Sequence, residues 1–104
     1  MILELFGSSS KSRLMDLFLD NPLFEFTRNE ITDALGMAKS TLYEILPDLE
    51  EAGVIVETRK IGKASLYRLN GESPIVGGIK GLIRSYVRAM ASMVSDNEQK
   101  SVVV

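Results

Sequence analysis

The sequence contains no cysteine and no histidine. Without cysteine the chain has neither disulfides nor a thiol that could sense redox state. Without histidine it lacks the usual base for serine and cysteine nucleophiles, and both side chains that dominate nitrogen-sulfur metal sites are absent. Nor does any acidic loop have the ligand spacing of a hard-cation site. We therefore expect a protein that is not an enzyme and that uses no metal or other cofactor.

Long uncharged runs are also missing from the sequence. The longest are residues 73–79 and 89–95, whereas a helix needs about 20 apolar residues to cross a bilayer. The apolar residues 1–6 follow no basic leader and are interrupted by Glu4, which is not the pattern of a secretion signal. We expect a cytoplasmic protein with no membrane partner, in which residues 1–6 pack on the body or on a partner chain.

Length and composition predict a single globular domain, since 45% of the 104 residues are hydrophobic and 25% are charged. The net charge of −2 is unfavourable for nucleic-acid binding, which depends on neutralising phosphates. The charge is unevenly distributed, however. Residues 54–70 hold four basic side chains against one glutamate, whereas residues 36–53 hold one lysine against four acidic side chains.

The centre of the sequence predicts two helices separated by a tight turn. Thr27 and Glu30 have the spacing of a capping box, in which each side chain bonds the backbone amide of the other residue. Gly36 can end this helix in the left-handed conformation. A second helix is expected to begin near Lys39. Pro47 lies within it, and we expect a kink there rather than an end because the apolar pattern continues beyond it.

A hairpin is expected after these helices. Residues 54–58 and 65–69 are β-prone, and the basic residues 59–63 are expected to form the turn between them. Two helices followed by a basic hairpin is the order of a winged helix-turn-helix.

Two more elements are expected before this motif. Residues 11–19 predict a helix with a broad apolar face, which ends where Asn21 precedes Pro22. Residues 23–26 alternate apolar and polar, so we expect a short third strand with Phe24 and Phe26 pointing inward.

The central stretch resembles the winged-helix transcriptional regulators of archaea and bacteria. The matching residues are Leu35-Gly36, Ser40-Thr41-Leu42, the segment LEEAGVI at 49–55 and Tyr67-Arg68-Leu69. The resemblance is to the broad MarR/ArsR/TrmB-like group, and to its archaeal members in particular. It implies an α+β, mostly α fold: a winged helix-turn-helix with a three-helix core and a β-hairpin wing. It also implies that recognition helices enter successive major grooves while the wings touch the flanking backbone. Some ArsR-like relatives sense metals through cysteine and histidine, which this chain cannot do.

The candidate DNA contacts lie at the starts of the two motif helices and in the hairpin. Small hydroxyls and a tyrosine can bond phosphates or base edges, and cations at a hairpin can reach the backbone or the minor groove. For Ser40 and Thr41 the alternative is a role in capping and solvating the helix. For the hairpin lysines it is protection of a sheet edge. The predicted DNA-binding residues are Thr27, Arg28, Lys39, Ser40, Thr41, Tyr43, Glu44, Arg59, Lys60 and Lys63.

After the hairpin the pattern changes to that of a long helix with Ser73 as its cap and Pro74 in its first turn. Apolar residues recur at spacings of three and four, which is typical of a coiled-coil seam, and nearby glycines leave room for a second backbone. We divide the chain into a winged domain at 1–72, a dimerisation helix at 73–95 and a flexible tail at 96–104. The alternative is that the helix packs on its own domain. The predicted interface residues are Ile79, Leu82, Ile83, Tyr86, Met90 and Met93.

Three functions fit this sequence. The first is a homodimeric, sequence-specific transcriptional regulator that binds double-stranded DNA. The second is a winged-helix module for protein interaction in a larger assembly, which the acidic recognition helix favours. The third is a regulator whose dimer interface binds a small apolar effector near Tyr86, Met90 and Met93.

Overall fold

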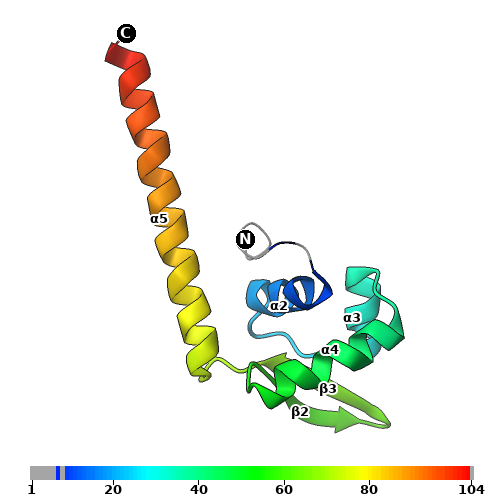
Figure 1. The fold of residues 1–104 in the computed structure, drawn as a ribbon. Coiled ribbons are helices and arrows are strands. Elements are labelled where there is room, and N and C mark those ends of the chain that lie inside the picture. Colours follow the sequence, from blue (N-terminus) through cyan, green and yellow to red (C-terminus); the bar gives the residue numbers. More distant parts are fainter. Residues whose placement is uncertain (1–6, 8, 104) are drawn as a thin grey trace.

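The protein folds as a small helical body with a β-sheet and one long helix that projects from it (Figure 1). The computed structural model describes residues 7 and 9–103, with side chains described as far as Met93. The packing expected for residues 1–6 therefore lies outside the described residues. In chain order the elements are α2 (Ser10–Asp20), β1 (Phe26–Thr27), α3 (Arg28–Leu35), α4 (Lys39–Glu51), β2 (Ile55–Ile61), β3 (Ala64–Leu69) and α5 (Pro74–Val103).

This arrangement is the winged helix-turn-helix predicted from the sequence. Helices α2, α3 and α4 gather against one antiparallel sheet whose strand order is β1-β3-β2, and the β2–β3 hairpin is the wing (Figure 1). Strand β3 occupies the centre of the sheet because it pairs with both β1 and β2. The long C-terminal helix α5 completes the predicted fold.

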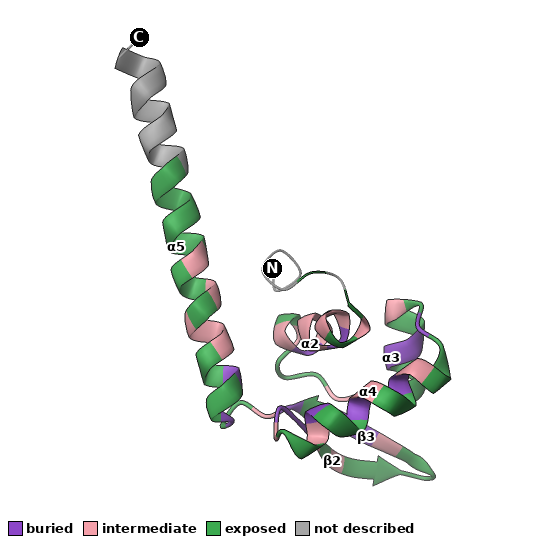
Figure 2. Ribbon diagram, viewed as in Figure 1, coloured by how far each residue is buried: buried purple, intermediate pink, exposed green. Residues whose placement is uncertain are grey.

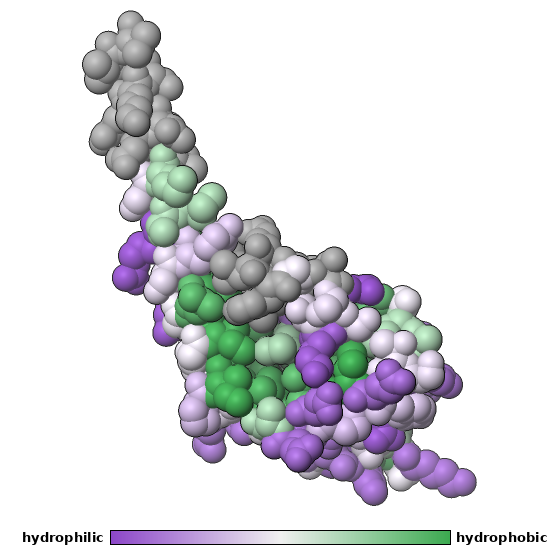
Figure 3. Space-filling view, in the orientation of Figure 1, coloured by the Kyte–Doolittle hydropathy of each residue, from purple (hydrophilic) through white to green (hydrophobic). Residues whose placement is uncertain are grey.

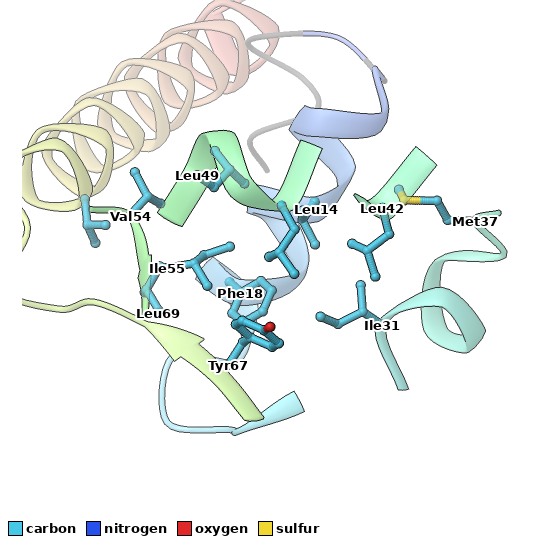
Figure 4. Packing of buried hydrophobic residues seen from close by; sticks show 12 residues of the cluster. Leu14, Phe18, Ile31, Met37, Leu42, Leu49, Val54, Ile55, Tyr67 and Leu69 are labelled. Carbon is cyan, nitrogen blue, oxygen red and sulfur yellow. The ribbon is translucent and has the colours of Figure 1, made fainter. Parts of the chain in front are cut away.

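One hydrophobic core joins the three helices to the sheet (Figure 4). Leu14 and Phe18 from α2, Ile31 from α3 and Tyr67 from β3 are each at most 1% exposed. The rings of Phe18 and Phe26 meet edge to face, with their centroids 5.4 Å apart. The sheet and the helices therefore share the same apolar interior, which fixes the position of the wing relative to α4.

The predicted helix boundaries are confirmed by their hydrogen bonds. The Glu30 amide donates to Thr27 Oγ1 at 3.1 Å, and the Thr27 amide donates to Glu30 Oε1 at 2.9 Å, so the capping box is complete. Gly36 ends α3 with φ at 59°. Asn21 ends α2, and α4 continues past Pro47 to Glu51. Local sequence signals therefore determine these ends.

The sheet differs from the prediction in two places. The third strand is Phe26–Thr27 rather than residues 23–26, and Phe24 is 63% exposed instead of pointing inward. The reason is a turn in which the Phe24 amide donates to the Asn21 carbonyl, which keeps residues 22–24 out of the sheet. Only Phe26 packs against the core, and the Phe24 ring stacks on it with centroids 6.1 Å apart.

The wing strands are also longer than predicted. Strand β2 runs to Ile61 and β3 starts at Ala64, so Arg59 and Lys60 lie in a strand and the turn is Gly62-Lys63. A register shift between Glu57 and Arg59 indicates a bulge, and the ladder continues beyond it. The expected basic turn at 59–63 is therefore wrong in its first half.

Helix α5 starts in the body and then leaves it. The Val76 amide donates to Ser73 Oγ at 3.4 Å, which confirms the predicted cap, and the Val76 side chain is fully buried. Beyond this turn the described side chains are half-buried or exposed (Figure 2), and the molecule measures 64 × 28 × 20 Å. No helix in the described part of the chain is long and apolar enough to span a membrane. Side chains of the tail expected at 96–104 lie outside the described residues.

Candidate nucleic-acid interface

The start of α3, the first turns of α4 and the wing turn meet around one groove. Its volume is about 260 Å³. It holds two cationic side chains and no carboxylate, although the chain as a whole is acidic. Four of the predicted DNA contacts, which are far apart in the sequence, are brought together here. The residues that line the groove are Thr27, Arg28, Asn29, Tyr43, Lys63, Ala64 and Ser65.

The first turns of α4 present the predicted polar face. Lys39, Ser40 and Glu44 are exposed, and Thr41 is half-buried. The N-cap of the helix is Ala38, which makes no side-chain cap hydrogen bond. Ser40 therefore does not cap α4 and is exposed in the first turn, where a helix leaves backbone amides without internal partners.

Arg28 has the most constrained position among the cations of the groove. Its guanidinium carbon lies 5.4 Å from the centroid of the Tyr43 ring and 5.3 Å from that of Tyr67. Both distances are within the range of cation–π attraction. Tyr43 is exposed on α4, whereas Tyr67 is buried in β3. Arg28 therefore connects α4 to the sheet.

The same surroundings change the pKa of the Tyr67 hydroxyl. Burial raises the pKa of Tyr67 above its ordinary value, while the positive charge of Arg28 and a hydrogen bond with Ser65 oppose that rise. The ring therefore stays neutral at physiological pH and offers its face to the guanidinium.

Arg59 lies in a different environment from the one predicted. Its Nε and a terminal nitrogen both bond Glu25 Oε2, at 3.2 Å and 3.0 Å, in an ion pair across β3. A hydrogen bond with Thr58 and the charge of Arg59 hold the pKa of Glu25 below its usual value. The expected cluster of three tip cations is therefore reduced, since Arg59 is neutralised by Glu25. Lys60 on β2 and Lys63 at the turn remain exposed.

The acidic side of α4 is partly neutralised as well. Asp48 Oδ2 accepts a bond from Lys11 Nζ at 3.1 Å, and both side chains are largely exposed. Glu44 is exposed one turn earlier, closer to the groove. Some of the negative charge counted in this helix is therefore balanced by α2.

One predicted contact of the groove is already hydrogen-bonded within the protein, and two other residues of its lining were not predicted. Thr27 lines the groove, but its oxygen already accepts the capping bond from the Glu30 amide. Asn29 and Ser65 also line the groove and were not predicted. Asn29 follows Arg28 directly and could have been found from that position, whereas the place of Ser65 depends on the hairpin register. Among the described residues, no group of three or more acidic side chains gathers as metal ligands would.

The predicted dimer seam lies on α5, away from the groove. Ile79, Ile83 and Tyr86 are half-buried. Figure 3 shows apolar side chains gathering where α5 leaves the body. The seam residues form an apolar stripe along one side of α5. At 3.6 residues per turn, Gly77 and Gly81 lie on the opposite side of the helix from this stripe, so they leave no room for a second backbone along it. The remaining seam residues are 42–58% exposed: Leu82, Met90 and Met93.

Solved structures share this fold at low sequence identity. MepR, a transcription regulator of the Staphylococcus aureus multidrug efflux pump MepA, is 18% identical with a TM-score of 0.65, over 96% of this chain and 77% of that one. A complex of S. aureus MepR with DNA is 15% identical with a TM-score of 0.62, over 98% of this chain and 86% of that one. A possible transcriptional regulator from Methanosarcina mazei Go1 is 14% identical with a TM-score of 0.60, over 86% of this chain and 78% of that one.

The sequence itself matches no protein-family model and no curated protein. The structural neighbours are transcription regulators, and at these identities the likeness establishes the fold. The narrower resemblance to archaeal regulators stays a prediction. The chain has the winged-helix architecture of transcription regulators, with a cationic groove between the start of α4 and the wing.

Proposed function

We propose that the protein is a homodimeric, sequence-specific DNA-binding transcriptional regulator. In this proposal the exposed first turns of α4 enter the major groove, and the wing contacts the adjacent backbone or minor groove. The apolar face of α5 forms the dimer seam with a second copy, and we place the protein in the cytoplasm.

The observation that carries the proposal is the composition of the groove. Although the chain has a net charge of −2, Arg28 and Lys63 both line this groove, and the described residues of its lining include no carboxylate. Tyr43, Asn29 and Ser65 supply hydrogen-bonding groups beside them. Cations surrounded by neutral hydrogen-bonding side chains are suited to a phosphodiester backbone. The structural neighbour solved with DNA supports the same use of the fold.

The test is a binding series on duplex DNA selected from random sequence by the purified protein. Lys63→Ala is expected to weaken binding to all duplexes by a similar factor and to reduce the salt slope by about 1, as the loss of one phosphate contact does. Arg88→Ala, an exposed cation on α5, is the matched control because it removes the same charge far from the groove. An unchanged salt slope for Lys63→Ala would exclude the wing turn as a phosphate contact.

The second candidate is a protein-interaction module. The exposed carboxylates Glu44 and Glu51 on α4 favour it, because they would repel phosphates. The pairing of Asp48 with Lys11 weakens this argument. Failure of the purified protein to bind any duplex at low salt would favour this second function over the first.

Binding of a small apolar effector at the dimer interface stays a prediction. It rests on the flexible and aromatic side chains of the seam, namely Tyr86, Met90 and Met93. Thermal unfolding of the dimer with a panel of hydrophobic compounds tests it directly, since a ligand that binds only the native state raises the midpoint.

A further inference from the structure

Arg28 lies against two aromatic rings that come from different elements. Tyr43 projects from α4 and Tyr67 from β3, and both ring centroids lie within 5.4 Å of the guanidinium carbon. We propose that Arg28 is the preorganised phosphate contact of the groove, and that Tyr43 and Tyr67 are its positioning residues. This inference rests on the proposed function and identifies which side chain anchors the DNA backbone.

The backbone of Arg28 is constrained as well as its guanidinium. It is the first residue of α3 and directly follows Thr27, whose capping box with Glu30 fixes the start of that helix. A long cationic side chain normally loses much rotational freedom when it binds a phosphate. For Arg28 part of that freedom is already lost in the unbound protein, so less is lost on binding.

The contacts of Arg28 leave its hydrogen-bond donors available. A guanidinium carries five N–H donors in a planar fork that matches phosphate oxygens, so two ring contacts still leave donors for an anion. Within the described part of the chain, the ion pairs of arginine and lysine are Arg59–Glu25 and Lys11–Asp48, so Arg28 has no carboxylate partner there. Its positive charge is therefore free for an external anion.

The opposite wall of the groove is suited to the same anion. Lys63 follows Gly62, whose φ of 61° forms the wing turn, and it lines the groove with Ser65. A phosphate in the groove would meet the fork of Arg28 on one wall and the point charge of Lys63 on the other. Lys60 differs from both, because it lies within β2 and is not among the residues that line the groove.

The first measurement needs no DNA. Ring currents of two tyrosines are expected to shift the Arg28 side-chain protons upfield in an NMR spectrum, relative to Arg84 and Arg88 on α5. Tyr43→Leu should reduce this shift, and the protein should stay folded because Tyr43 is 56% exposed. Arg28 resonances like those of the α5 arginines would overturn the positioning roles of both tyrosines.

The second measurement is a double-mutant cycle on duplex DNA with Arg28→Gln and Tyr43→Leu. Arg28→Gln is expected to weaken binding about tenfold and to reduce the salt slope by about 1, because a charged hydrogen-bonding contact is lost. Tyr43→Leu removes no charge, so it should weaken binding severalfold and leave the salt slope unchanged. When Tyr43→Leu is added to Arg28→Gln, it should weaken binding little further, because Tyr43 acts by positioning Arg28.

Each outcome of the cycle decides one point. Equal losses for Tyr43→Leu in both backgrounds would show that Tyr43 touches DNA independently, and would overturn its positioning role. Parental affinity for Arg28→Gln would overturn the phosphate role of Arg28 while leaving the proposed function intact. A parental protein that binds no duplex would overturn the proposed function and the phosphate role together.

A separate variant tests Tyr67. Tyr67→Phe keeps the ring face and should bind DNA like the parent. A loss of affinity as large as that of Arg28→Gln would exclude the Tyr67 ring face as the surface that positions Arg28.

Discussion

The winged body and helix α5 differ most in how they cover their apolar side chains. Among the described residues, every buried hydrophobic side chain except Val76 belongs to the body. Along α5, Leu82, Met90 and Met93 repeat at the spacing of a seam but are 42–58% exposed. Apart from exposed side chains such as Leu23, Phe24 and Ile61, the body therefore buries its hydrophobic pattern within one chain, whereas α5 carries a similar pattern that this chain leaves partly uncovered.

This difference separates two sources of stability. The body depends on packing between α2, α3, α4 and the sheet, which a single copy supplies. An apolar stripe on a projecting helix gains most when another surface covers it, and the proposed second copy would do so with the same residues. Changes in the body should therefore alter unfolding, while changes in the stripe should alter assembly.

The largest effect is expected from the core of the body. Phe18→Ala removes a fully buried ring that packs against Phe26, and should lower the free energy of unfolding by about 3–5 kcal/mol. Val87→Ala on α5 is the control, because that side chain is 43% exposed and a surface change should stay within about 0.5 kcal/mol. Urea unfolding measures both. Similar losses for the two variants would contradict the division between body and helix.

The next effect concerns assembly and is tested by truncation. A chain that ends after Gly78 keeps the Ser73 cap and the buried Val76 but lacks the stripe. It should fold, sediment as a monomer and bind a two-site duplex about 100-fold more weakly, since the avidity of linked half-sites is lost. Ending at Gly71 instead would remove Val76 from the core and confuse assembly with stability.

A point variant provides the control for this truncation. Ile83→Asp with Tyr86→Asp places charges in the stripe without shortening α5, and should also give a monomer because unpaired carboxylates are costly to bury. If light scattering finds a dimer for the truncated chain or for this variant, the second copy does not cover the stripe.

A smaller effect is expected at the capping box. Thr27→Ala removes the oxygen that accepts the Glu30 amide, which should cost about 1 kcal/mol of stability. Thr41→Ala is a matched threonine control within the first turns of α4, and should change the preferred DNA sequence more than the stability. Equal destabilisation by the two changes, measured by thermal unfolding, would show that the cap contributes nothing of its own.

The sequence predicted those parts of the fold that local signals determine. The capping box of Thr27 and Glu30, the left-handed Gly36 and the Ser73 cap each depend on residues within one or two turns. The burial of Phe24 was predicted wrongly because alternation alone does not show where a strand starts. Here the turn after Asn21 delays the strand until Phe26.

The site was predicted less completely because its contacts link distant segments. Arg59 was placed at the wing tip, but Glu25, which neutralises it, lies 34 residues away in the sequence. The contact between Arg28 and Tyr67 likewise depends on the pairing of Thr27 with Leu66 in the sheet. No spacing rule along a helix or a strand reports such a contact.

The smallest effect concerns charge, and it tests whether the body pairs Arg59 with its own Glu25. Glu25→Gln removes the carboxylate that binds Arg59, and both partners are partly exposed, so stability at neutral pH should change little. The pKa of Glu25 is lowered from 4.5 in the folded protein, by the Thr58 hydrogen bond first and by Arg59. Its contribution is therefore fully present above the unfolded pKa and is lost as pH falls through the lower folded one. Below pH 4.5 the unfolding midpoints of parent and variant should converge. On DNA the freed Arg59 should tighten binding slightly and steepen the salt dependence, whereas identical salt slopes would mean that Arg59 does not reach the backbone even when released.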